Sequence, residues 1–151
     1  MDPVPAFSVQ VAPWRERAVA LQAIRRTVFV LEQHVPESEE WDAFDALSQH
    51  VIALVDDTPI GTGRLLPDGH IGRMAVVKAW RGRGVGRALL AQLLRLARQS
   101  ALTEVVLHAQ THALKFYEKQ GFTVSGPVFM EAGIAHRVMR LTLRDQLRAQ
   151  L

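Results

Sequence analysis

Three glycines at alternate positions, in the segment RGRGVG at positions 81–86, constrain this chain more than any other feature. They lie between a β-rich run that ends at Val77 and an amphipathic helix pattern that begins at Val85. Glycine has no Cβ atom, so a ligand can approach the main chain, and a helix N-terminus presents unpaired N–H groups at its positive dipole end. The segment therefore predicts a cradle for a diphosphate, with a flexible turn as the alternative.

The glycine spacing separates this segment from two other phosphate-binding motifs. A dinucleotide fingerprint needs a glycine at position 87, where this chain has arginine. A P-loop needs four residues between its first glycine and a Gly-Lys-Ser/Thr sequence, which is absent here. We therefore expect neither of these sites.

Strand and helix patterns alternate along the chain. We expect strands over 7–11, 50–55, 60–66, 70–77, 104–109, 122–124 and 137–143, and helices over 17–30, 85–98 and 112–120, with a short helix at best over 42–47. Residues 56–59 predict a hairpin turn, and Gly121 is typical of a residue that ends a helix. A second hairpin is expected across a loop near Gly133. This order predicts an α/β sheet of mixed strand direction.

Composition favours one globular domain over residues 1–151, with a core of about 5–143 and a short charged tail. The chain has 151 residues, of which 48% are hydrophobic, and it has no cysteine. Disulfides, thiolate metal sites and a cysteine nucleophile are thereby excluded. No apolar run approaches the roughly 20 residues that cross a bilayer, and the N-terminus does not resemble a signal peptide. We expect a cytoplasmic protein.

A second motif extends from Gln110 to Phe122, where the aromatic pair Phe116-Tyr117 precedes Gly121. With the glycine segment, it resembles the GCN5-related N-acetyltransferase (GNAT) family, whose R/Q-x-x-G-x-G/A signature matches Arg81, Gly84 and Gly86. The family usually has asparagine where this chain has Gln110. A resemblance over nearly the whole chain is to the ElaA-like branch, and it is carried by Arg25, residues 28–33, Asp42, Asp45, His50, residues 71–73, 109–110 and 131–136, and Met139.

The resemblance implies a mostly antiparallel central sheet of about seven strands, flanked by about four helices and split between strands four and five. It also implies acetyl-CoA as co-substrate, with the pantetheine arm lying in the split as an added strand would. The backbone of Met74, Ala75 and Val76 would bind this arm. The remaining cofactor-binding residues are expected to be Arg81, Gly82, Arg83, Gly84, Val85, Gly86, Arg87, Gln110 and Phe116.

The resemblance further implies an N-acetyltransferase that acts on a primary amine, either a small molecule or an exposed amino group. Tyr117 matches the family's tyrosine that donates a proton to the leaving sulfur. Because there is no cysteine to carry the acyl group, direct attack in a ternary complex is expected. His70 is the first candidate for the base that accepts the amine's proton. His112 and water are alternatives, while Glu32, Gln33 and His136 are expected to line the acceptor pocket.

The charged residues indicate less about the function than the two motifs do. Five carboxylates gather next to Trp41 and Phe44, namely Glu37, Glu39, Glu40, Asp42 and Asp45. They favour a cationic acceptor if they border its site, and a solvated helix face otherwise. No compact metal-ligand spacing occurs, so we expect no metal.

The residues and the resemblance also give expectations about partners. We expect no membrane partner and, without a recognised motif beside the basic residues, no nucleic acid. A homodimer is a further expectation, because members of the resembled family often pair.

A non-catalytic module that binds CoA or acyl-CoA is the alternative to the transferase function.

Overall fold

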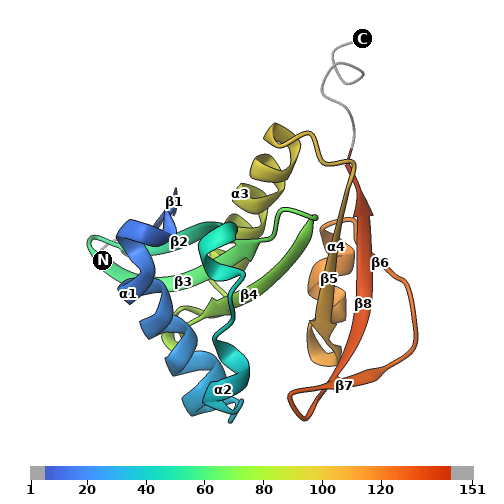
Figure 1. Ribbon diagram of the computed structural model, residues 1–151, viewed down its shortest axis with the longest axis horizontal. Coiled ribbons are helices and arrows are strands. Elements are labelled where there is room, and N and C mark those ends of the chain that lie inside the picture. The colour runs from blue at the N-terminus through green and yellow to red at the C-terminus, as the bar shows by residue number, and fades with distance from the viewer. Residues whose placement is uncertain (1–5, 144–151) are drawn as a thin grey trace, which may run out of the picture.

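An eight-stranded mixed sheet organises the structure, which is a computed structural model that describes residues 6–143 (Figure 1). The strand order is β1-β2-β3-β4-β5-β8-β6, with β7 paired to β8. Every pairing is antiparallel except the parallel one between β4 and β5. The strands are β1 (Ser8–Val11), β2 (Gln49–Val55), β3 (Thr58–Leu65), β4 (His70–Val76), β5 (Glu104–Gln110), β6 (Thr123–Val124), β7 (Phe129–Glu131) and β8 (Ile134–Thr142).

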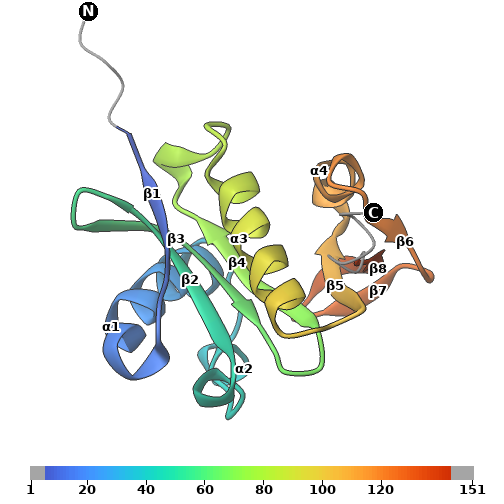
Figure 2. The same ribbon diagram turned by 90° about the horizontal axis from the view of Figure 1, so that it is seen from above.

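Helices cover both faces of this sheet. Figure 2 shows α1 and α2 on one face and α3 on the other. The α-helices are α1 (Trp14–Arg25), α2 (Glu37–Glu40), α3 (Val85–Gln99) and α4 (Leu114–Lys119), and a π-helical segment, Arg26–Glu32, continues α1. Short 3₁₀ turns span Asp45–Leu47, Lys78–Trp80 and Thr111–Ala113. Among the described residues, no helix is both long and apolar enough to cross a lipid bilayer.

The main core forms where α3 packs on the sheet. Val85, Leu89 and Leu93 lie one or two helical turns apart and are almost fully buried, which is the stripe expected of an amphipathic helix. Two glycines of β3 allow the close approach. A Cβ atom on Gly61 would lie 2.9 Å from Leu89 Cδ1 and 3.1 Å from a main-chain oxygen of β4, and one on Gly63 would lie 2.8 Å from Leu93 Cδ1.

The predicted strands agree with the structure in order, and the expected split between strands four and five is confirmed. The short helix expected at best over 42–47 is a 3₁₀ turn over Asp45–Leu47, and α2 was not predicted. The expected helix over 17–30 is in fact α1 followed by the π-helical segment, and the sheet has eight strands because β7 was not predicted. The turn between β2 and β3 is shorter than expected, since Thr58 and Pro59 already belong to β3. The expected loop near Gly133 connects β7 to β8. Residue 5 and the expected tail after residue 143 lie outside the described residues.

Candidate active site

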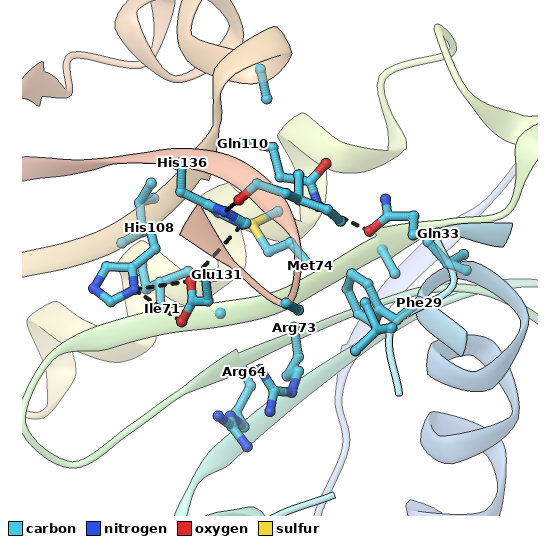
Figure 3. Close-up of a pocket in the computed structure, with 18 of the residues that line it drawn as sticks. Phe29, Gln33, Arg64, Ile71, Arg73, Met74, His108, Gln110, Glu131 and His136 are labelled. Carbon is cyan, nitrogen blue, oxygen red and sulfur yellow. Dashed lines mark hydrogen bonds and ion pairs between the residues drawn. The ribbon is translucent and has the colours of Figure 1, made fainter. Parts of the chain in front are cut away.

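The β4–β5 pair opens into a gap. Only two positions pair, His70 with Val106 and Ile71 with Leu107, and beyond Ile71 the two strands diverge. The edge of β4 from Gly72 to Val76 therefore has no partner strand on this side. The gap contains a cavity of about 880 Å³, which is lined by residues of both halves of the sheet (Figure 3). Free strand edges leave unpaired main-chain groups that can bind an extended, amide-bearing ligand.

A bulge shapes the β4 side of this cavity. Between the pairs Thr62–Ala75 and Arg64–Gly72, β4 contains one residue more than β3. Arg73 absorbs the extra length with a left-handed φ of 51°, and its carbonyl oxygen accepts a hydrogen bond of 3.0 Å from the Thr62 hydroxyl. The three residues predicted to bind the pantetheine arm, Met74, Ala75 and Val76, all line the cavity directly after the bulge.

The glycine segment forms the turn between β4 and α3. Gly82 and Gly84 have positive φ angles of 73° and 84°, which favour glycine over other residues. A Cβ atom on Gly82 would meet no atom within 4 Å, so its main chain faces open space. Gly84 is the N-cap of α3 and provides no side-chain cap, which leaves the first N–H groups of the helix without the usual partner. These features fit the predicted diphosphate cradle.

The side chains around this turn contact other parts of the protein, so the turn leaves mainly its main chain for a ligand. Arg83 lies over the Trp80 ring at 4.9 Å from its centroid. Val85 is buried in the core, so only its main chain can serve a ligand. Phe116, predicted to touch the cofactor, lies 3.6 Å from the position that a Cβ atom on Gly86 would take, and it therefore packs α4 beside the start of α3. A Cβ on Gly84 would meet only Arg87 Nη2, at 3.9 Å.

Tyr117 lies in the wall of the cavity. Its hydroxyl is 3.7 Å from Met74 Sδ, and its ring packs edge-on against Phe116 and Phe122. Burial raises the pKa of Tyr117 to about 12, because the phenolate would lose its hydration. The side chain therefore keeps its proton at neutral pH and can donate it to a basic atom in the cavity.

Of the residues expected to line the acceptor pocket, Gln33 lies in the wall of the cavity and Glu32 does not. Gln33, which follows the π-helical segment, accepts a 2.9 Å hydrogen bond from Gln110 Nε2 at the end of β5, so these two amides join the halves of the sheet. Gln110 Oε1 is 2.7 Å from His112 Nε2. Glu32 differs from the expectation. It forms an ion pair with both terminal nitrogens of Arg81 and is not among the described residues that line the cavity.

The Glu32–Arg81 pair connects the π-helical segment to the glycine segment. Arg81 Nε also donates a 2.9 Å hydrogen bond to the Val76 carbonyl. Hydrogen bonding to Arg81 lowers the pKa of Glu32, so the carboxylate stays charged. Three predicted site residues are thus joined here, and Glu32 lies beside the glycine segment and not in the wall of the cavity.

Three histidines, His70, His108 and His136, line one part of the cavity. His70 lies at the start of β4, with Nδ1 3.0 Å from Asp68 and its ring edge-on to His108. Glu131 lies between His108 and His136, with its carboxylate 3.2 Å from His108 Nδ1 and 3.9 Å from His136 Nε2. Sequence reasoning missed His108 and the role of Glu131. The only available signal was that His108 interrupts an otherwise apolar strand pattern.

The acidic segment borders the cavity, but most of its charge is neutralised. Glu40 and Asp45 are buried and paired with Arg25, whose guanidinium contacts both carboxylates at 2.8 Å. Burial opposes the ionisation of Asp45, but hydrogen bonds and ion pairs with Arg25 and Arg64 outweigh it and lower its pKa. The predicted attraction of a cation by this segment therefore rests on fewer free charges than the sequence indicates.

A second arginine pair holds the segment to the bulge. Arg73 lies 3.3 Å from Glu40 and 3.2 Å from Asp42, and Arg64 lies 2.9 Å from Asp42. These contacts join the loop after α2 to the bulged part of β4. Within residues 6–143, no group of three or more histidine, aspartate or glutamate side chains is placed to hold a metal ion.

Comparison with known proteins agrees with this geometry. The family described as "Acetyltransferase (GNAT) domain" matches residues 12–143. The chain belongs to the GNAT acetyltransferase family. YyaT of Bacillus subtilis, an uncharacterised protein, is 40% identical to this chain over 122 residues, which cover 77% of this chain and 82% of YyaT.

Two solved structures are similar to this chain over almost their whole length. The crystal structure of Escherichia coli ElaA has a TM-score of 0.80 at 29% identity, and the match covers 88% of this chain and 98% of that one. An acyl-CoA N-acyltransferase from Pseudomonas aeruginosa has a TM-score of 0.79 at 31% identity, with 89% and 99% covered. ElaA is also 31% identical in an alignment that covers 78% of this chain and 82% of ElaA. The predicted family and its ElaA-like branch are therefore confirmed.

Proposed function

We propose that this chain is a cytoplasmic N-acetyltransferase that transfers an acetyl group from acetyl-CoA to a primary amine by direct attack in a ternary complex. The observation that carries the proposal is the gap between β4 and β5, where unpaired strand edges and a protonated tyrosine face one cavity. The family, and the similarity to the acyl-CoA N-acyltransferase of Pseudomonas aeruginosa, support an acyl-CoA donor.

Each part of the site would serve one part of the donor. The edge formed by Met74, Ala75 and Val76 would hold the pantetheine arm through main-chain hydrogen bonds. The N–H groups of residues 83–87, at the uncapped start of α3, would hold the pyrophosphate with help from the helix dipole. Acetyl-CoA supplies an activated thioester, and this chain supplies its position and the protons.

Tyr117 would donate its proton to the departing sulfur. A thiolate whose thiol has a pKa near 8.5 is basic enough to receive a hydrogen bond and then a proton from a positioned phenol. The main-chain N–H of Met74 or Ala75, just after the bulge, would polarise the thioester carbonyl. Since the pKa of Tyr117 is raised to about 12, the donor form persists across the physiological range.

Two variants test binding and chemistry separately. Gly84→Leu places a side chain in the open space beside the turn at a φ of 84°, so calorimetry should detect at least tenfold weaker binding of acetyl-CoA. Gly126→Leu is the matched control, because Gly126 also has a positive φ and open surroundings but lies in a loop that contributes no residue to the cavity. Tyr117→Phe should retain acetyl-CoA affinity and lose about 10²-fold in kcat, measured as thiol release across a panel of amines.

The outcomes separate the proposal from the alternative module that only binds CoA or acyl-CoA. Binding without thiol release from any amine would support the non-catalytic module. No detectable binding of acetyl-CoA by the wild-type protein would rule out both functions. An unchanged rate in Tyr117→Phe would remove this tyrosine from its role but leave the transferase in place.

A further inference from the structure

His136 offers a free ring nitrogen to the cavity. The residue lies on β8 opposite Gln110, and its side chain is only 9% exposed. Nδ1 is 2.6 Å from the carbonyl oxygen of Ile134. A carbonyl can only accept, so Nδ1 carries the proton of the neutral ring and Nε2 carries the lone pair. No hydrogen bond from a described residue occupies Nε2.

Glu131 is placed to stabilise a proton on this nitrogen. Its carboxylate lies 3.9 Å from His136 Nε2, a distance that leaves Nε2 free to bind another group and places a negative charge beside the ring. The other side of Glu131 faces His108 Nδ1 at 3.2 Å. Figure 3 shows Glu131 between the two histidine rings. Since the side chains of Glu131 and His108 are 50% and 38% exposed, the pair also connects the buried ring to solvent.

We propose that His136 Nε2 accepts the proton that the acceptor amine loses, with Glu131 stabilising the imidazolium. This proposal rests on the acetyltransferase function proposed above. The amine nitrogen forms a bond to the thioester carbon, and the C–S bond breaks with its electron pair on sulfur. The nitrogen's proton moves to His136, and the sulfur takes the proton of Tyr117. Proton exchange with solvent then restores both side chains, so that amine and thioester give amide and thiol.

Other charged groups around His136 are compatible with this role. Glu131 on β7 and His108 on β5 face the ring, and His70 on β4 lies behind His108 at 6.1 Å between ring centroids. The neighbouring Arg137 directs its guanidinium to the carbonyl oxygen of Gly126. Phe129 stacks on the His136 ring and holds its plane. The nearest fixed charge is therefore the negative one of Glu131.

The first test compares kcat/KM for thiol release with two acceptors at pH 7.5. Butylamine is an ammonium ion at this pH and must lose a proton before it can attack, whereas hydroxylamine is already neutral. His136→Gln should therefore lower kcat/KM for butylamine about 10²-fold, with a smaller loss for hydroxylamine. Glu131→Gln should lower kcat/KM for butylamine as well, because the imidazolium loses its neighbouring carboxylate. A merely structural role for His136 would lower kcat/KM equally for both acceptors.

The control is His34→Asn, which makes the same kind of change at an exposed histidine that does not line the cavity. Asparagine tolerates the positive φ of 61° at this position, so the fold should be kept. His136→Gln must also bind acetyl-CoA with wild-type affinity in calorimetry, which separates loss of the base from loss of the donor site. If the wild-type protein neither binds acetyl-CoA nor releases thiol, the proposed function fails and this proposal fails with it.

A second measurement tests the proposal without turnover. Long-range ¹H–¹⁵N NMR spectra of the neutral His136 ring should show the Nδ1–H tautomer, and an Nε2–H tautomer would overturn the assignment because no lone pair would face the cavity. In the kinetic test, equal losses for butylamine and hydroxylamine in His136→Gln would also overturn it. If His70→Gln shows the selective loss for butylamine instead, the base is His70, as the sequence first suggested.

Discussion

Arg25 is enclosed by the protein and has both of its carboxylate partners on the segment before β2. Its guanidinium is 1% exposed and contacts Glu40 and Asp45, and it lies between the rings of Trp14 and Trp41 at 5.9 and 5.2 Å. Taking a charge out of water is costly, and here three charged groups share that cost through close contacts. Removal of Arg25 would leave Glu40 with only Arg73, and Asp45 with only Arg64, as a close cationic partner.

The substitution Arg25→Met tests this account at the scale of one residue. We expect a loss of about 3 kcal/mol in the free energy of unfolding, because the two buried carboxylates keep only one arginine each, Arg73 for Glu40 and Arg64 for Asp45. Urea denaturation at pH 7 would measure it. Arg26→Gln is the matched control. The neighbouring Arg26 pairs with Glu37 at the surface, where both side chains are about half exposed, and its loss should change stability by no more than about 1 kcal/mol.

Single residues of the site differed in how well the sequence revealed them. Tyr117 and the glycine segment are recognisable because their neighbours in sequence are also their neighbours in space. Glu131 and His136 belong to one hairpin, but His108 comes from another strand and meets them only through the pairing of β5 with β8. Glu32 was misplaced because its partner, Arg81, is 49 residues away in the chain. Contacts between distant segments depend on strand order, which local pattern does not contain.

At the scale of elements, the close packing of α3 against the sheet depends on two glycines of β3. A Cβ atom on Gly61 would lie 3.1 Å from the carbonyl oxygen of Ala75, which belongs to the main chain and cannot rotate away. We expect Gly61→Ala to lower the free energy of unfolding by about 1–3 kcal/mol through overpacking, measured by thermal and urea denaturation.

Gly72→Ala provides the matched comparison for this prediction. Gly72 lies on β4, its φ is not positive, and an added Cβ would meet no atom within 4 Å. Its stability should therefore stay within about 0.5 kcal/mol of the wild-type protein. Equal destabilisation by the two substitutions would show that loss of glycine in a strand, and not crowding against α3 and β4, causes the effect.

Element boundaries were the weakest part of the sequence prediction. The long apolar pattern over 17–30 does not distinguish an α-helix from an α-helix that continues with a wider turn, since both bury one face. β7 was missed because Phe129–Glu131 is only three residues long and shows no alternation that could be detected. β4 was predicted almost to the residue, but its bulge was not, because Arg73 gives no local sign of a left-handed conformation.

At the scale of the whole molecule, the sheet divides while the core does not. β4 and β5 pair at two positions only, yet one apolar cluster joins α3 and β3 to β5 and β8. The cluster therefore passes behind the gap and ties the two halves together. A ligand site can open between the strands without separating the molecule into two folding units.

Continuity of the core predicts a single unfolding transition. All three tryptophans, Trp14, Trp41 and Trp80, lie before α3, so their fluorescence reports the first half of the chain, whereas far-UV circular dichroism reports both halves. Urea curves from the two probes should coincide within error. A circular dichroism transition displaced from the fluorescence transition would show that β5–β8 unfold independently.

The π-helical segment Arg26–Glu32 has a consequence for how relatives of this chain can diverge. A π-turn holds one residue more than an α-turn, so deletion of a single residue here can be absorbed by rewinding to an α-helix, without a break in the chain. Because the deletion removes the extra residue of the wide turn, the chain after the segment keeps its phase, and Gln33 stays within reach of Gln110. One codon lost here would therefore change which side chains of the segment face the gap, while Gln33 and the sheet stay in place.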